Sequence, residues 1–435
     1  LGKVSGTEEN GIRMFRGIPY AITERFELPK PYPAWDVFDA TQTEVDCIQY
    51  RTYHDEAGQF YHEEFRAGKT RDDWRFAESP MTMNIISRTE AKRDPVLVFI
   101  HGGSFENGCI GEDPYGTSTE YAKHNILYIS LGYRLNVFGL YKSGNYGLHD
   151  LVFGLKWIKE HIADYGGDPN KITIMGQSAG AMSVMDLLYT QTLKGVIRGA
   201  IMMSGGGAVP DMAGPLTPAE SDEIFWSKVR EKAGAKSEEE FKAMPSKTIH
   251  EAWYECARSI GTVRTQQPGI DGTIIPKMPS KIMREGSYLD VPVIAGVTSQ
   301  DFMPYIIFDI AEGMGIIRSF HRHYPVWGYM FDKELPGKKY KAFHAADLWY
   351  MFGNMDKSWR PFGEEDFKLR DEMVQYVANF VYYGNPNGGG LPYWPSLSFR
   401  RRQFRYFGDD ERRLIGPVRS RNKEWKTFFR DKGPM

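Results

Sequence analysis

The fold class is decided by the stretch Ile172-Thr-Ile-Met-Gly-Gln-Ser178-Ala-Gly180. Its first four residues form a short apolar run, which is typical of a strand buried on both faces. A helical pattern begins at Ala179, so Ser178 stands in the turn between the two predicted elements. In this setting Gly-x-Ser-x-Gly predicts a nucleophile elbow, in which the two glycines let strand and helix approach and the serine hydroxyl points out of the turn. The alternative is a serine that only caps the helix.

Similar apolar runs recur along the chain and alternate with helical periodicity. The runs lie at 95–100, 126–130, 200–203 and 291–295, and helical patterns cover 148–162 and 179–188. Buried strands that alternate with helices predict the α/β class, with a central, mostly parallel, twisted sheet flanked by helices. In such sheets ligands bind at the carboxyl ends of the strands.

Composition excludes several classes of protein. The 435 residues are 41% hydrophobic and 25% charged, which is ordinary for a globular protein, and the net charge of −2 gives no general attraction for nucleic acid or anionic lipid. Three cysteines make a disulfide framework or a metal cluster improbable, and there is no apolar run long enough for a transmembrane helix. These features favour a cytoplasmic location, although a chain that starts at Leu1 leaves secretion open.

A second glycine motif follows the predicted strand at 95–100. His101-Gly102-Gly103-Ser104-Phe105 places two residues without side chains directly after a strand. A serine acyl-transfer enzyme needs backbone amides that face the oxygen on which negative charge develops, and glycine lets that oxygen come close. Gly102, Gly103 and Ala179 are therefore the predicted oxyanion-hole donors.

At this point the chain resembles the type B carboxylesterases, the family of the α/β-hydrolase fold that includes the cholinesterases. The motifs that carry the resemblance run nearly end to end: Gly17-Ile-Pro-Tyr-Ala21, the motif at 101–105, Gly132-Tyr-Arg-Leu-Asn136, Gly144 to Asp150, Tyr165-Gly-Gly-Asp-Pro169, the elbow at 176–180, and Phe380 to Pro386. The resemblance implies one domain over 1–435, with cap insertions near 207–285 and 303–340. It also implies a serine carboxylesterase that needs no cofactor or metal.

The resemblance also supplies the partners of Ser178. The family carries its acid five residues after a glycine that ends a buried strand, which here is Asp301 in Gly296-Val-Thr-Ser-Gln-Asp301. Most members have glutamate at this position, so the shorter aspartate requires a closer backbone. Phe343-His344-Ala-Ala-Asp347 is similar to the family's histidine segment, which makes His344 the predicted general base.

Other expectations concern the surroundings of the site. Gln177 stands where cholinesterases have glutamate, which argues against a cationic choline-type substrate. Phe105, Phe138 and Phe302, next to the motifs in sequence, are candidate substrate-binding rings together with Gln177. The resemblance pairs Arg25 with Glu78 and Arg134 with Asp150. Cys47 matches a family half-cystine, but its partner segment 78–84 contains no cysteine.

The spacing of the predicted acid and base is also unusual. Asp301 and His344 lie 43 positions apart, about half the family's interval. This shortening predicts a reduced cap and an open cleft.

The predicted function is hydrolysis of small-molecule carboxylic esters through an acyl-enzyme. One alternative keeps the triad but acts on amides, thioesters or lactones, because leaving-group choice depends on pocket shape. The other is a non-catalytic binding module, since some family members have lost the triad. The sequence does not determine the oligomeric state or the physiological ester.

Overall fold

The computed structural model describes residues 2–42, 44–205, 214–301, 323–337, 341–397, 403–409 and 414–415. Phe302 and most of the predicted cap segment 303–340 lie outside these ranges. Within them the chain forms an eleven-stranded sheet and three small two-stranded sheets.

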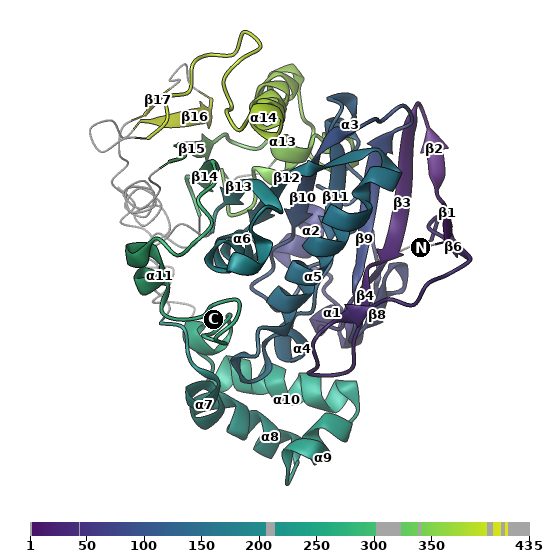
Figure 1. Ribbon diagram of the computed structural model, residues 1–435, viewed down its shortest axis with the longest axis vertical. Helices are drawn as coiled ribbons and strands as arrows, with labels where there is room; N and C mark the ends of the chain where they lie inside the picture. Colours follow the sequence, from purple (N-terminus) through teal and green to yellow (C-terminus); the bar gives the residue numbers. More distant parts are fainter. Residues whose placement is uncertain are drawn as a thin grey trace.

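The large sheet is mostly parallel (Figure 1). Its strands in spatial order are β17 (Leu414–Ile415), β16 (Phe404–Gly408), β15 (Val326–Asp332), β14 (Val293–Thr298), β13 (Ile197–Met203), β12 (Gly167–Gln177), β10 (Asp94–Ile100), β11 (Leu127–Leu131), β9 (Thr82–Arg88), β3 (Ile12–Pro19) and β2 (Thr7–Glu9). The strands from β16 to β11 are parallel, while β9, β3, β2 and β17 pair antiparallel with their neighbours. The predicted α/β class with a mostly parallel sheet is confirmed.

The remaining elements surround this sheet. The small sheets pair β1 (Lys3–Ser5) with β6 (Val37–Asp39), β4 (Ala21–Ile22) with β5 (Lys30–Pro31), and β7 (Val45–Cys47) with β8 (Arg75–Ala77). The helices are α1 (Tyr50–Tyr53), α2 (Phe60–Phe65), α3 (Glu120–Lys123), α4 (Asn136–Leu140), α5 (Tyr146–His161), α6 (Ala179–Tyr189), α7 (Pro218–Ser221), α8 (Ser227–Ala233), α9 (Glu238–Ala243), α10 (Ser246–Ser259), α11 (Pro279–Glu285), α13 (Leu348–Phe352) and α14 (Glu364–Tyr383).

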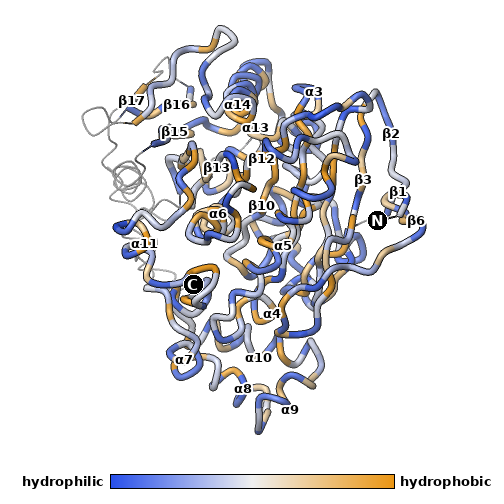
Figure 2. The backbone as a smooth tube through the Cα atoms, in the orientation of Figure 1, coloured by the Kyte–Doolittle hydropathy of each residue, from blue (hydrophilic) through white to orange (hydrophobic). Residues whose placement is uncertain are grey.

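The central strands are buried on both faces because successive side chains enter two different cores. On β10, Val96, Val98 and Ile100 pack into the core under α5 and α6. Leu97 and Phe99 point the other way, into the core under α3, α13 and α14. This period of two, with both faces apolar, explains the continuous hydrophobic runs in the sequence. Figure 2 shows hydrophobic stretches on β10, β12 and α6 inside the molecule.

Two local differences from the sequence analysis have simple causes. The strand expected at 291–295 begins two residues later, at Val293, since Pro292 has no N–H to donate to a neighbouring strand. The segment 214–285 forms the short helices α7 to α11, of which α7 to α10 lie together at one end of the molecule (Figure 1), with α10 packed against α8 and α4.

Candidate active site

The predicted elbow forms between β12 and α6. Ser178 has φ 56° and ψ −125°, a conformation that non-glycine residues rarely adopt. Its N–H donates to the Met203 carbonyl at 2.8 Å, and its own carbonyl accepts from the N–H of Met182 at 3.0 Å, which begins the helix. A Cβ at Gly180 would lie 2.1 Å from the Ile100 carbonyl oxygen, so the motif's glycine is required where helix and strand touch. The strained backbone is held from both sides, and the partly exposed Ser178 marks the edge of the core.

Asp301 and His344 meet although they come from separate loops. Asp301 follows β14, and His344 precedes α13. The backbone of Gln300 pairs with that of Phe343 as a parallel bridge, so the two loops are already side by side. Asp301 Oδ2 lies 2.8 Å from His344 Nδ1, and Thr298 Oγ1 donates to the same oxygen at 3.1 Å. The shorter aspartate therefore reaches the imidazole, and its side chain is fully buried.

This contact defines the tautomer of the imidazole. A carboxylate can only accept hydrogen bonds, so Nδ1 of His344 carries the proton and Nε2 presents its lone pair. Gln177 Nε2 lies 3.2 Å from that nitrogen and can donate to it. Gln177 is the last residue of β12, immediately before Ser178, so the elbow and the histidine loop are neighbours.

The predicted oxyanion-hole residues lie against the elbow. A Cβ at Gly102 would come within 2.9 Å of Ser178 Cβ and 2.6 Å of the Gln177 carbonyl oxygen, so the strand end passes directly beside the serine. Gly103 is exposed, and Ala179 is buried as the first residue of α6. The backbone just before this turn is fixed, because Tyr133 Oη donates to the His101 carbonyl at 2.9 Å. Burial lowers the pKa of His101 to about 4, so its ring is neutral.

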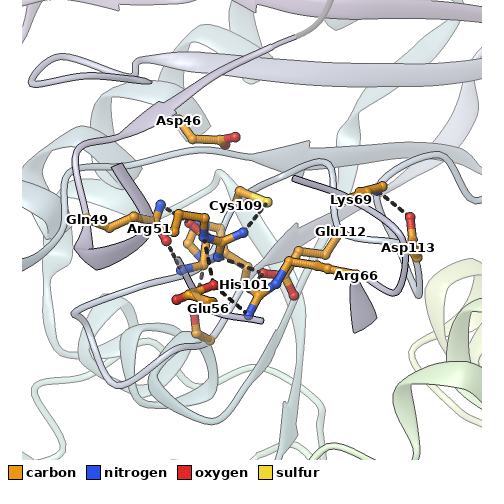
Figure 3. A network of polar contacts seen from close by, with 12 residues as sticks. Asp46, Gln49, Arg51, Glu56, Arg66, Lys69, His101, Cys109, Glu112 and Asp113 are labelled. Atoms are coloured by element: carbon orange, nitrogen blue, oxygen red, sulfur yellow. Dashed lines mark hydrogen bonds and ion pairs between the residues drawn. The ribbon is translucent and has the colours of Figure 1, made fainter. Parts of the chain in front are cut away.

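The sequence analysis did not identify the residues that fix the loop between Gly102 and Gly108. The Gln49 side chain forms two hydrogen bonds with the backbone of Gly108: Oε1 accepts from its N–H and Nε2 donates to its carbonyl, both at 3.0 Å. Beside it lies a buried network of charged residues (Figure 3). Glu112 Oε1 accepts from Arg66 at 2.7 Å and from Arg51 at 3.2 Å.

The charges of this network balance locally. Burial would raise the pKa of Glu112, but Arg66 and Arg51 outweigh burial and hold it below the usual value. Glu56 Oε2 lies 3.2 Å from Arg66 and 3.6 Å from Arg51. These charged residues are irregularly spaced along the chain and form no periodic pattern, so only the fold reveals the network.

The segment that carries the network also contacts the histidine loop. Tyr61 Oη on α2 donates to the His344 carbonyl at 3.2 Å, and the Phe60 ring packs edge-on against that of Phe343 with centroids 5.0 Å apart. Glu64 accepts from Trp349 Nε1 at 3.1 Å, next to the same loop. Residues 49–66 therefore support both the Gly102 loop and the His344 loop.

A second buried carboxyl lies close to His344. Asp347 accepts from Tyr329 Oη at 2.8 Å, and burial raises the pKa of Asp347 to about 6. The hydrogen bond from Tyr329 and the proximity of His344 only partly offset that burial.

The predicted ion pairs are confirmed. Arg134 donates to Asp150 through Nε at 2.8 Å and Nη2 at 2.7 Å, and both side chains are buried. Arg25 pairs with Glu78 through Nε at 2.8 Å but is partly exposed, and it also donates to the Met244 carbonyl at 2.6 Å.

The other singled-out residues are mostly buried. Phe105 and Phe138 lie in the core under α5 and α6, Gln177 is buried beside His344, and Phe302 falls outside the described residues. Cys47, Cys109 and Cys256 are free thiols. Cys47 Sγ accepts from the N–H of Leu135 at 3.3 Å.

The described ranges contain no group of three or more His, Cys, Asp or Glu side chains placed to hold a metal ion. None of the helices described there combines the length and apolarity that a membrane span requires.

The strand order, the serine elbow and the Asp–His pair at the carboxyl ends of parallel strands define an α/β-hydrolase. The family model described as "Carboxylesterase family" matches residues 1–316 and 306–424. The chain therefore belongs to the carboxylesterase family and is a carboxylic ester hydrolase.

Individual relatives agree with this assignment. The para-nitrobenzyl esterase of Bacillus subtilis (strain 168) is 29% identical, with 92% of each chain covered. The pyrethroid hydrolase Ces2e of Rattus norvegicus is 26% identical over 89% of this chain and 81% of that protein. A solved PNB esterase superposes with a TM-score of 0.79 at 25% identity and 93% coverage of both chains. The carboxylesterase of Geobacillus stearothermophilus gives 0.76 at 26% identity, covering 93% of this chain and 94% of that one.

Proposed function

We propose that this carboxylesterase hydrolyses its ester through an acyl-enzyme formed on Ser178. The observation that supports this proposal is the 2.8 Å contact between Asp301 Oδ2 and His344 Nδ1, next to a serine in strained elbow geometry. His344 Nε2 takes the proton from Ser178 Oγ as that oxygen attacks the ester carbonyl. Asp301 keeps the imidazole in the required tautomer and stabilises the imidazolium that forms.

The remaining steps use the same groups. The amides of Gly102, Gly103 and Ala179 bind the oxyanion of the tetrahedral intermediate. The alcohol leaves with the proton held on His344. Water then loses a proton to His344 and attacks the acyl-enzyme, which releases the acid and restores Ser178.

We propose a small, uncharged ester as the substrate class and an open cleft in a single domain, with the described segment 214–285 as part of its wall. Gln177 supports this proposal because it contributes an amide rather than a carboxylate beside the base, and so offers no charge to a cationic alcohol. Three free thiols favour a reducing, cytoplasmic compartment.

A series of p-nitrophenyl esters from acetate upward tests the proposal, with Ser178→Ala as the control. We expect serine-dependent turnover and, when the reaction is quenched early, a mass increase of one acyl group on the peptide that contains Ser178. Matched amide, thioester and lactone substrates identify the preferred bond. Full activity in Ser178→Ala would refute the mechanism.

A further inference from the structure

We propose that Gln177 is a positioning residue whose side-chain amide serves both protonation states of His344. This inference rests on the proposed function, in which His344 gains and loses a proton during each acyl transfer. It starts from the 3.2 Å contact between Gln177 Nε2 and His344 Nε2, the nitrogen that exchanges the proton.

The contact assigns the amide's orientation in the resting state. Because Nδ1 of His344 donates to Asp301, Nε2 is an acceptor and must face the NH₂ group of Gln177. The amide oxygen then lies toward Gly102, where an added Cβ would be 2.8 Å from Gln177 Oε1. Gln177 and His344 are only 4% and 5% exposed, so water has little access to replace the amide as a partner.

Proton transfer reverses the requirement at Nε2. Once Nε2 has received the proton from Ser178 it becomes a donor, and an NH₂ group facing it would be repelled. A half-turn of the carboxamide about its last side-chain torsion presents Oε1 to Nε2–H and moves the NH₂ group toward Gly102. There its N–H bonds would face the side on which the oxyanion is proposed to form. Because Nε2 has one lone pair, and later one N–H, the amide shares this nitrogen with the group that exchanges the proton, donating beside it before transfer and accepting beside it afterwards.

Other side chains of similar length lack this property. A glutamate at 177 can only accept, so it would favour the imidazolium and oppose the neutral base. A methionine can neither donate nor accept in a useful way, and it would leave both states without this partner. The amide combines a donor and an acceptor in one uncharged group, so it can face Nε2 in either protonation state.

The surroundings of His344 stay constant in such a comparison. Among the titratable groups that face it are Asp301 on Nδ1, Asp347 at the start of α13, and Tyr61 of α2 on its backbone carbonyl. None of these is changed by a substitution at Gln177. A difference between variants therefore reports the group placed against Nε2.

The test is the pH dependence of kcat/KM for an uncharged p-nitrophenyl ester, measured in wild type, Gln177→Glu and Gln177→Met. We expect the acidic limb of the Gln177→Glu profile to lie about one to two pH units higher, because a negative charge at this distance stabilises the imidazolium. Gln177→Met should keep the position of the limb and lose about tenfold in kcat/KM over the whole profile. Gln191→Glu adds the same charge at an exposed site and should leave the profile unchanged.

Two further measurements keep the outcomes distinct. If Gln177→Glu does not fold, the side-chain amide signals of wild-type Gln177, identified by their loss in Gln177→Met, should shift across the acidic limb in NMR spectra. Each of three results would overturn the inference. The acidic limbs of Gln177→Glu and wild type could coincide, the Gln177→Glu and Gln177→Met limbs could shift equally, or the Gln177 amide signals could stay constant over the pH range of the limb. Activity in Ser178→Ala would overturn the proposed function itself, whereas an inactive Ser178→Ala with unshifted limbs would overturn only the role of Gln177.

Discussion

Replacing Asp301 by asparagine isolates the hydrogen bond that orients His344, the proposed general base. The two side chains have nearly the same shape, and the site is fully buried, so packing is preserved. Asp301 Oδ2 accepts from both His344 Nδ1 and Thr298 Oγ1. If the asparagine NH₂ takes that position it donates to Nδ1, which moves the imidazole proton to Nε2 and removes the base. If its oxygen takes that position, the negative charge that stabilises the imidazolium is lost.

Either orientation should lower kcat strongly. We expect a fall of about 10³- to 10⁴-fold, equivalent to about 4 to 5 kcal/mol of transition-state stabilisation. The assay is kcat and KM for a p-nitrophenyl ester, with unfolding by urea as the check on folding. Asp347→Asn is the matched control, because this buried carboxyl also lies near His344 but bonds to Tyr329, and it should cost less than tenfold. A kcat for Asp301→Asn within tenfold of wild type would show that another group orients His344.

Further predictions concern the oxyanion loop and the buried charges. Gly102→Ala should lower kcat by about 10²- to 10³-fold. The new Cβ would lie 2.6 Å from the Gln177 carbonyl oxygen, so the Gly102 amide would be displaced from the oxyanion. Single-turnover acylation at the wild-type rate would contradict this prediction. Burial raises the pKa of Asp347 to about 6, so this carboxyl binds its proton more tightly in the folded protein than in the unfolded chain. The stability that this proton contributes is therefore lost as pH rises through about 6. Asp347→Asn should therefore be more stable than wild type at pH 8, by up to about 3 kcal/mol, with no difference below about pH 4; urea unfolding at both pH values checks this, and a pH-independent difference would count against it. Asp150→Ala should destabilise by about 3 to 5 kcal/mol, since it leaves the buried Arg134 unpaired, and a loss below about 1 kcal/mol in urea unfolding would refute that estimate.

The proposed catalytic pair, Asp301 and His344, shows what a family resemblance adds to local patterns. No short-range signal connects Asp301 with His344, and the match to family motifs alone selected them from the available carboxylates and histidines. The structure brings them together through the backbone bridge between Gln300 and Phe343. The aspartate reaches the imidazole despite its missing methylene because this bridge holds the two loops close.

The support beneath the Gly102 loop shows where sequence reasoning stops. Gln49, Arg51 and Arg66 stand in a stretch that has no motif, and they contact Gly108 and Glu112 far along the chain. Their roles depend on how the fold places this segment against residues 108–112. Likewise, the antiparallel strands β9, β3 and β2 lack the continuous apolar runs that reveal the central strands.

Local sequence patterns are sufficient to predict the α/β class, the strands at 95–100 and 172–175, the elbow at Ser178 and the glycines at Gly102 and Gly103. Each of these is encoded locally, because burial on both faces produces an apolar run and a tight turn demands small residues. The contact between Gln177 and His344 Nε2, by contrast, is visible only in the folded protein. Such contacts depend on strand order and on the placement of loops from distant parts of the chain, and no local window of sequence specifies those.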